Sequence, residues 1–384
     1  MKSAFLLLYL LLCGLGNPAQ PLQLPLAPRP TVSAFAQLVQ EPEETNQEPE
    51  AEKEKPEKKK FEPGSLQDYS FADGVKALVA AKQSWRTERK CVSCHTNGWG
   101  LAAQPIIAPK SEEVSVGRSF AQKYLKKYLD QKAKPDGQHG STEGMVATTA
   151  FLALSDARSE KILHEVTRQG LDHAWGLLDK SGTWLDWLQC NWPPFESDAE
   201  FGPTLMLVAL GELRKVTRIR SSDVANAKKL GRYLKKNPPK SLHAKAMRLW
   251  AANYWPSIMR NKNETSTWRK ELLSAQQTDG GWSMASLSGP AWKRDGGEEQ
   301  TKTSEAYPTA FATYVLIQME LASKKPKDQG VDRESITKGL HWLRKNQYEG
   351  GTWFTRSPRR DRKHYISRAA TAFALMALAE GGQQ

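Results

Sequence analysis

The sequence contains little cysteine and no apolar run long enough to cross a membrane. Four cysteines in 384 residues are too few for a scaffold held together by disulfides. The most apolar stretch, residues 4–12, is shorter than the roughly 20 residues that a membrane-spanning helix requires. Alternation of apolar and polar residues with period two is also absent over any useful length, which argues against β-strands. These absences leave an all-helical fold as the expectation.

The N-terminal residues have the features of a secretion signal. Lys2 supplies the basic start, and residues 4–12 supply the short apolar region. Ala34-Phe35-Ala36 before Gln37 matches the small-x-small cleavage rule, and cleavage after Ala19 is the alternative. We therefore expect a signal peptide over residues 1–36 and a secreted or periplasmic protein.

Residues 37–67 are expected to form a disordered tether, because Pro, Glu and Lys dominate and apolar residues are nearly absent. The remaining residues, 68–384, suffice for one large helical domain. The formal net charge is +13, and the tether does not supply it. This charge indicates either a well-solvated surface or attraction to anionic partners and membrane surfaces. Because Lys and Arg are scattered and not interleaved with aromatics, we expect no nucleic-acid binding.

From residue 68 onward, amphipathic helices alternate with helices that are apolar nearly all round. The amphipathic segments are residues 71–85, 116–131, 159–178, 221–236, 265–277 and 333–347. The apolar segments are residues 142–157, 197–213, 241–254, 304–321 and 367–381. This alternation predicts an α/α toroid of about five to six helix hairpins, with an inner ring of buried helices. An open solenoid of the same hairpins is the alternative.

A repeated turn, QxxxGxW, follows two of the expected outer helices. It spans Gln276–Trp282 and Gln347–Trp353, with a degenerate copy at Asp179–Trp184 and a truncated one at Gln83–Trp85. Glycine permits the positive φ that stops a helix, and the Gln amide can cap a neighbouring hairpin. The Trp ring covers the joint with a large apolar area. The motif therefore predicts a structural device.

These turns, with Gly339-x-x-Trp342-Leu343 before Gln347, resemble the QW repeat of squalene-hopene and oxidosqualene cyclases. Protein prenyltransferases share the toroid fold that this resemblance implies. The acidic DxDD cluster with which squalene-hopene cyclases protonate their substrate is absent from the sequence. The zinc ligands of prenyltransferases are not recognisable either. The resemblance therefore extends to the fold and the turns, and not to the catalytic acid.

The sharpest chemical motif is CxxCH, formed by Cys91, Cys94 and His95. Two thiols at this spacing can add to the vinyl groups of haem, and the next imidazole can ligate its iron as proximal ligand. The motif predicts covalent haem c, held in a loop over residues 86–115. A redox dithiol and half of a zinc site are the alternatives. Met145 is the candidate distal ligand, with a core side chain as the alternative.

Other polar and aromatic residues occur at or on the expected inner helices. Acidic residues recur at the helix starts, and we expect them to be caps, with Ser197 and Glu200 forming a capping box. A ring of acids around a cavity mouth is the alternative. These acids are Glu143, Asp198, Glu200 and Glu305. The aromatics are expected in the core, with stabilisation of carbocations as the alternative. They are Phe151, Phe201, Trp250, Tyr307, Tyr314 and Phe373.

Two further features are expected to be structural. Cys190 is read as a buried free thiol. The aromatic loop around it, residues 187–195, is expected to cover one end of the barrel or to act as its lid.

The sequence thus predicts an exported, squalene-cyclase-like toroid with one covalent c-type haem. Its expected role is electron transfer with a redox partner protein, or redox chemistry on an apolar small molecule held in the barrel. One alternative is a terpenoid cyclase or isomerase with a non-standard acid, which requires a deep apolar cavity and a buried carboxyl group of raised pKa. The other is a non-catalytic binding or scaffold module.

Overall fold

The computed structural model describes residues 64–130, 141–188, 191–259, 261–323, 330–361 and 363–382. The predicted signal peptide, nearly all of the predicted tether and Cys190 lie outside these ranges. Within them, no helix combines the length and the apolar content that a bilayer span requires.

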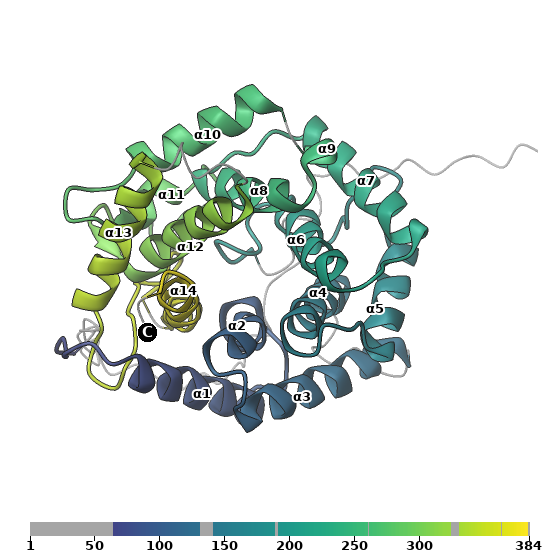
Figure 1. Ribbon diagram of the computed structural model, residues 1–384, viewed down its shortest axis with the longest axis horizontal. Coiled ribbons are helices and arrows are strands. Elements are labelled where there is room, and N and C mark those ends of the chain that lie inside the picture. Colours follow the sequence, from purple (N-terminus) through teal and green to yellow (C-terminus); the bar gives the residue numbers. More distant parts are fainter. Residues whose placement is uncertain are drawn as a thin grey trace, which may run out of the picture. The chain divides into compact units, whose positions relative to one another are not determined.

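Six helix hairpins form two concentric rings (Figure 1). The outer helices are α1 Phe71–Glu88, α3 Glu112–Leu129, α5 Glu165–Gly176, α7 Ser221–Lys236, α10 Lys262–Ser274 and α13 Gly330–Lys345. The inner helices are α2 Trp99–Ile107, α4 Ser141–Ser159, α6 Phe201–Val216, α8 Leu242–Tyr254, α12 Ala306–Ala322 and α14 Ile366–Glu380. Each inner helix packs on the next, and α14 packs on α2, so the inner ring is closed. The predicted α/α toroid is confirmed.

Short elements complete the described chain. A π-helix, η2 (Cys94–Gly98), leads directly into α2. Helices α9 (Pro256–Met259) and α11 (Met284–Leu287) occupy the connections on either side of α10. Strands β1 (Trp282–Ser283) and β2 (Ser304–Glu305) form one antiparallel pair beside α12.

The prediction of a loop over residues 86–115 was wrong, because η2 and α2 together form the first inner helix. Pro105 inside α2 and the glycines at its start are signals against a helix. Tertiary packing outweighs them, because α2 is buried between α14 and α4. A Cβ on Gly98 would lie 2.5 Å from the Phe151 ring, so this glycine permits a close approach between the two helices.

The QxxxGxW turns join neighbouring hairpins as predicted. Trp282 Nε1 donates to Leu272 O at 2.8 Å, and Trp353 Nε1 donates to Leu343 O at 2.8 Å. Each ring therefore closes on the helix that precedes its turn. The degenerate copy keeps this bond, since Trp184 Nε1 donates to Ala174 O at 3.0 Å.

The truncated copy at Gln83–Trp85 is not such a turn. These residues lie inside α1, which continues to Glu88. The prediction of a fourth copy was therefore wrong. Trp85 instead packs against the residues that follow the CxxCH motif, as described below.

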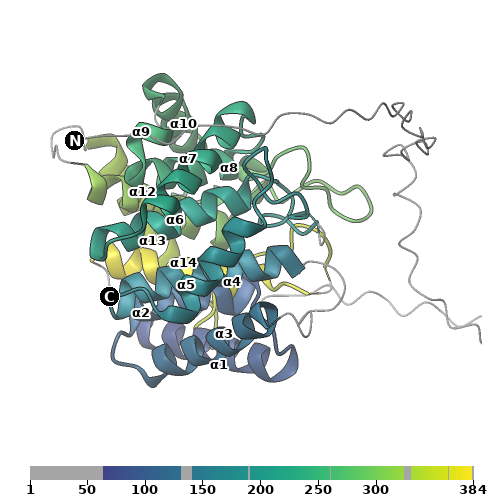
Figure 2. The same ribbon diagram turned by 90° about the vertical axis from the view of Figure 1, so that its right-hand side faces the viewer.

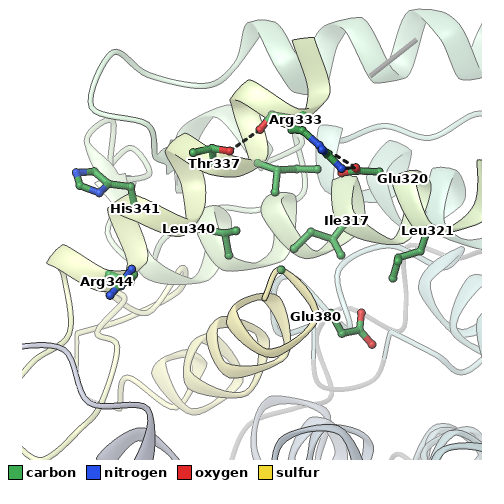
Figure 3. A pocket seen from close by; sticks show the side chains of 11 residues that line it. Ile317, Glu320, Leu321, Arg333, Thr337, Leu340, His341, Arg344 and Glu380 are labelled. Carbon is green, nitrogen blue, oxygen red and sulfur yellow. Dashed lines mark hydrogen bonds and ion pairs between the residues drawn. The ribbon is translucent and has the colours of Figure 1, made fainter. Parts of the chain in front are cut away.

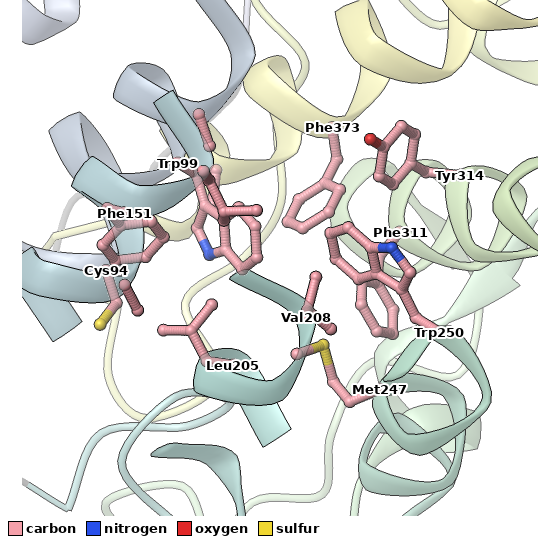
Figure 4. Packing of buried hydrophobic residues seen from close by; sticks show 14 of the residues in the cluster. Cys94, Trp99, Phe151, Leu205, Val208, Met247, Trp250, Phe311, Tyr314 and Phe373 are labelled. Atoms are coloured by element: carbon pink, nitrogen blue, oxygen red, sulfur yellow. The ribbon is translucent and has the colours of Figure 1, made fainter. Parts of the chain in front are cut away.

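Aromatic rings fill the axis of the inner ring (Figure 4). The Trp99 ring centroid lies 4.5 Å from that of Phe373 and 5.1 Å from that of Phe151. The Trp250 centroid lies 5.2 Å from that of Tyr314. Contacts this close leave no space for a ligand between the rings. The predicted core role of the inner-helix aromatics is confirmed.

Candidate functional site

The inner helices all run in the same direction, because an outer helix precedes each of them. Their N-termini therefore gather at one end of the toroid, which we call the N-terminal rim. The rim comprises the first residues of α2, α4, α6, α8, α12 and α14, with the long loops that lead to them (right in Figure 2). The fold places Cys94 and His95 of η2 and Met145 of α4 at this rim. It thus brings the predicted site residues to one end of the molecule.

The side chain of Asn97 holds the CxxCH segment in shape. Its amide oxygen accepts from Ser93 N at 2.9 Å, and its amide nitrogen donates to Cys91 O at 2.8 Å. Cys94 is 5% exposed and lies beside Phe151 at the margin of the aromatic core (Figure 4). Cys91 is partly buried, and no disulfide joins it to Cys94. The two thiols therefore stand on a backbone turn fixed by a side chain of the same segment.

His95 is surrounded by aromatic rings and a guanidinium. Its ring stacks on Tyr365 at 5.2 Å and meets the Trp85 ring edge-on at 4.9 Å. Its Nδ1 lies 3.0 Å from Thr96 Oγ1. Burial, with the nearby charge of Arg368, lowers the pKa of His95 to about 3. The imidazole is therefore neutral at physiological pH, which is the form that binds a metal.

Met145 is 1% exposed in the first turns of α4, the inner helix next to α2. Thr149 Oγ1 lies 3.7 Å from its sulfur, and the ring contacts of His95 are with Trp85 and Tyr365. The structure places Met145 and His95 at the same rim without recording a contact between them. The distal-ligand prediction stays a prediction.

The acids of the rim are buried, but they do not act as the predicted caps. Glu200 and Glu305 occupy N-cap positions without a capping side-chain hydrogen bond, and Ser197 Oγ has no partner within the described residues. The predicted capping box was therefore wrong. Glu305 instead accepts from Arg356 N at 2.9 Å. Asp198 accepts at 3.3 Å from both Ser241 Oγ and Trp292 Nε1. The acids join loops to the rim.

Burial changes the protonation of these carboxyl groups. It raises the pKa of Glu305 to about 7, and it also raises the pKa of Asp198 and Glu200. Glu143 is buried at the start of α4. The rim therefore contains carboxyl groups that hold a proton more strongly than exposed ones.

Sequence reasoning missed His243, which lies within the rim on α8. Its Nε2 is 2.9 Å from Tyr307 Oη, and burial lowers its pKa to about 3. The Cys94 thiol lies close enough to Tyr307 to affect the pKa of its hydroxyl. The signal for His243 was its place near the start of an apolar segment, where a polar ring needs a partner.

The aromatic loop before α6 covers the barrel end, as predicted. Phe195 is 2% exposed and its ring contacts Tyr307 at 5.9 Å. Trp187 Nε1 donates to Phe195 O at 2.9 Å, which holds the loop closed on itself. Trp192 is only partly buried, and the guanidinium groups of Arg359 and Arg360 lie over its ring.

A cavity of about 610 Å³ lies elsewhere, between α12, α13 and α14 (Figure 3). Ile317, Leu340 and Glu380 line it, with the ion pair of Arg333 and Glu320 at 2.7 Å. Ile317 and Glu380 belong to the C-terminal halves of their helices. This cavity is therefore at the end of the inner ring opposite the CxxCH motif. Within the described residues, no three His, Cys, Asp or Glu side chains gather as a metal site would require.

Comparison with known proteins supports the fold. No protein-family model matches the chain, and no curated protein matches it. Unsaturated glucuronyl hydrolase from Bacillus sp. GL1 is similar in structure, with a TM-score of 0.51 and 11% identity, over 82% of this chain and 97% of that one. This likeness shows the α/α-toroid fold and nothing about chemistry.

A second solved structure with a similar arrangement is ent-copalyl diphosphate synthase from Streptomyces platensis. It aligns with a TM-score of 0.48 and 19% identity over 74% of this chain. The present chain spans about half the length of that protein, with 50% of it covered.

Proposed function

We propose that this protein is an exported α/α toroid that carries one covalent c-type haem on Cys91 and Cys94 and serves in electron transfer. The observation that carries the proposal is the CxxCH sequence at the start of the first inner helix, with a neutral imidazole at His95. Thiols at this spacing followed by histidine are the attachment signature of c-type haem. Export fits the proposal, because this haem is attached outside the cytoplasm.

The residues around the motif fit a haem in their donor chemistry. His95 Nε2 has no hydrogen-bond partner among the described residues, whereas Nδ1 is held by Thr96. The Trp85 indole nitrogen and one terminal nitrogen of Arg368 are buried without a partner in the described part of the chain. Buried polar groups are normally paired. Unpaired ones beside a neutral imidazole therefore support a missing polar ligand there.

Each residue has a definite role in this proposal. The thiols of Cys91 and Cys94 each add across one vinyl group, which forms a C–S bond and moves the thiol proton to carbon. No oxidant is needed for this step. His95 is the proximal ligand, and Met145 is the candidate distal one. The bound haem would supply one-electron redox chemistry. Asn97 fixes the loop that presents the thiols.

Electron transfer to a partner protein is favoured over redox chemistry on an apolar ligand in the barrel. The aromatic rings that fill the axis occupy the place of such a ligand. The rim, by contrast, lies at an end of the toroid where a second protein has access.

The test is the mass and the spectrum of the exported full-length protein, produced in a host with haem c maturation machinery. We expect a pyridine haemochrome spectrum of c type and a haem-sized mass increase on the peptide that contains Cys91 and Cys94. Cys91→Ser combined with Cys94→Ser should abolish covalent haem, because no thiol remains to form a thioether. Cys190→Ser, the matched control, should retain it.

An exported protein without covalent haem would overturn the proposal. A loss of two hydrogen masses on the same peptide would instead support the dithiol alternative, because a disulfide removes two hydrogens.

The cyclase alternative meets one of its two requirements. Glu305 is a buried carboxyl group with a pKa of about 7, as that alternative demands. The deep apolar cavity is the second requirement, and rings in mutual contact fill the axis where it would lie. We therefore do not propose cyclisation.

A further inference from the structure

The guanidinium of Arg368 lies in the first turn of α14, against the CxxCH site. It covers the Trp85 ring at 5.4 Å and the Tyr365 ring at 5.1 Å. These are the same two rings that contact the His95 imidazole. Arg368 therefore shares an aromatic frame with His95, and its charge helps to keep the imidazole neutral.

Arg368 lacks the carboxylate partner that other buried arginines have. Its Nη1 is buried without a hydrogen bond, and within the described residues no carboxylate lies within ion-pair distance of it. Leaving a buried charged donor unpaired is costly. Elsewhere each comparable arginine pairs with an acid. These pairs are Arg118–Asp156, Arg158–Glu212, Arg168–Asp223 and Arg294–Asp361, at 2.7, 2.6, 2.7 and 2.7 Å.

A second arginine points to the same place from another helix. Arg89 follows the last residue of α1, and its guanidinium lies 5.8 Å from the Trp85 ring. It donates to Tyr365 Oη at 3.2 Å. It too has no ion pair with a carboxylate among the described residues. Two cations from opposite ends of the sequence thus converge beside His95, with the buried Trp85 Nε1 as a third unpaired donor.

We propose that Arg368 and Arg89, with Trp85 Nε1, form a carboxylate-binding site beside His95. Planar guanidinium groups bind carboxylates with paired hydrogen bonds, which matches the unpaired donors here. The carboxylate has two candidate sources, a propionate of the haem proposed above or a dissociable organic acid. In the first case the inference rests on the proposed function. In the second it stands alone.

The haem-loaded protein tests the first source through its midpoint potential. A guanidinium near the porphyrin disfavours the more positive oxidised iron, so Arg368→Leu should lower the potential. We expect at least a tenfold change in the ratio of oxidised to reduced protein at fixed potential, which is 59 mV for one electron. Arg368→Lys keeps the charge and should restore most of the potential.

The matched control is Arg360→Leu, because Arg360 also lies over an indole ring, that of Trp192, at 5.1 Å. It should leave the potential unchanged. Equal potentials for Arg368→Leu and the wild type in haem-loaded protein would overturn the carboxylate site while leaving the haem proposal intact.

If the protein carries no covalent haem, titration calorimetry with succinate tests the second source. We then expect binding to the wild type and to Arg360→Leu, with affinity at least tenfold weaker for Arg368→Leu. That result would support the carboxylate site although the proposed function had failed. Absence of succinate binding to the haem-free wild type would overturn the site as well.

Discussion

Single residues at the N-terminal rim combine burial with ionisable chemistry. Helix starts attract acids because the helix dipole favours negative charge there, yet Glu305 and Asp198 meet loop groups and not the amides of their own helices. Neutral His95 and His243 lie at the same rim, each with a pKa of about 3. The rim therefore concentrates groups whose protonation differs from that of exposed ones, which is typical of functional sites.

Glu305 should make the stability of the protein depend on pH. Its folded-state pKa of about 7 exceeds the ordinary value of 4.5, so the folded state retains a proton that the unfolded state loses. The associated stability is present below about pH 4.5 and is lost as the pH rises through 7. The loss should reach about 3 kcal/mol of unfolding free energy. Urea unfolding at pH 5 and pH 8 measures it.

Glu305→Gln provides the comparison, because an amide does not titrate. The variant should lose less stability between pH 5 and pH 8 than the wild type does. Identical losses in the two proteins would show that Glu305 does not hold its proton, and would contradict the raised pKa.

At the scale of elements, the QxxxGxW turn works through the glycine two residues before the tryptophan. Gly182, Gly280 and Gly351 occupy this position with φ of 92°, 92° and 82°. A Cβ on each would lie 2.7, 2.7 and 2.3 Å from a backbone oxygen of the next outer helix. The glycine therefore has two functions, a left-handed backbone and contact between hairpins. This also explains why the degenerate copy works with Leu178 in place of the glutamine.

Gly280→Ala should destabilise the protein more than Gly296→Ala. Both glycines have positive φ, 92° and 89°, so both variants suffer the same backbone strain of about 1–2 kcal/mol. Only Gly280 has a neighbour, the Lys338 carbonyl oxygen at 2.7 Å, whereas Gly296 has open space. The extra clash should add about 1–3 kcal/mol. Urea unfolding of the two variants gives the difference.

Equal destabilisation by the two alanine substitutions would mean that α13 moves freely away from the turn. It would then follow that the glycine is needed for its backbone conformation alone.

At the scale of the whole molecule, Gln347 closes the outer ring. It is fully buried, and its amide bonds Ser70 N at 2.7 Å and Ser70 O at 2.9 Å, across 277 residues of sequence. A bridge between Leu66 and Tyr348 lies next to it. The last hairpin thus caps the first helix, which removes the open ends that a solenoid would expose.

Gln347→Leu should loosen α1 selectively. The substitution leaves two backbone groups of Ser70 without partners, at a cost of about 2–4 kcal/mol. Hydrogen exchange should accelerate over residues 71–88 more than in the helices on the far side of the ring. Gln276→Leu is the control, since Gln276 bonds Ser335 O at 2.9 Å and joins α10 to α13. It should act on α13 and leave the protection of α1 unchanged.

Uniform loss of protection in both variants would indicate a toroid that opens as one unit. In that case the closure at Gln347 would have no special role.

The sequence alone determined much of the fold, because its signals are local. The periodicity predicted eleven of the twelve ring helices, and α7 has the predicted bounds, Ser221–Lys236. The missed helix, α2, is nine residues long and contains Pro105. Its stability comes from burial between α14 and α4, which no local pattern reports.

For the candidate site, the sequence by itself determined Cys91, Cys94 and His95, since their spacing carries the chemistry. Only the tertiary structure decided what surrounds them. Ring closure brings Tyr365 and Arg368, from the last hairpin, against Trp85 and His95 of the first. Burial in that frame then sets the protonation of the imidazole and leaves the guanidinium without an acid. Both effects depend on contacts between the two ends of the chain, and such contacts exist only in the closed ring.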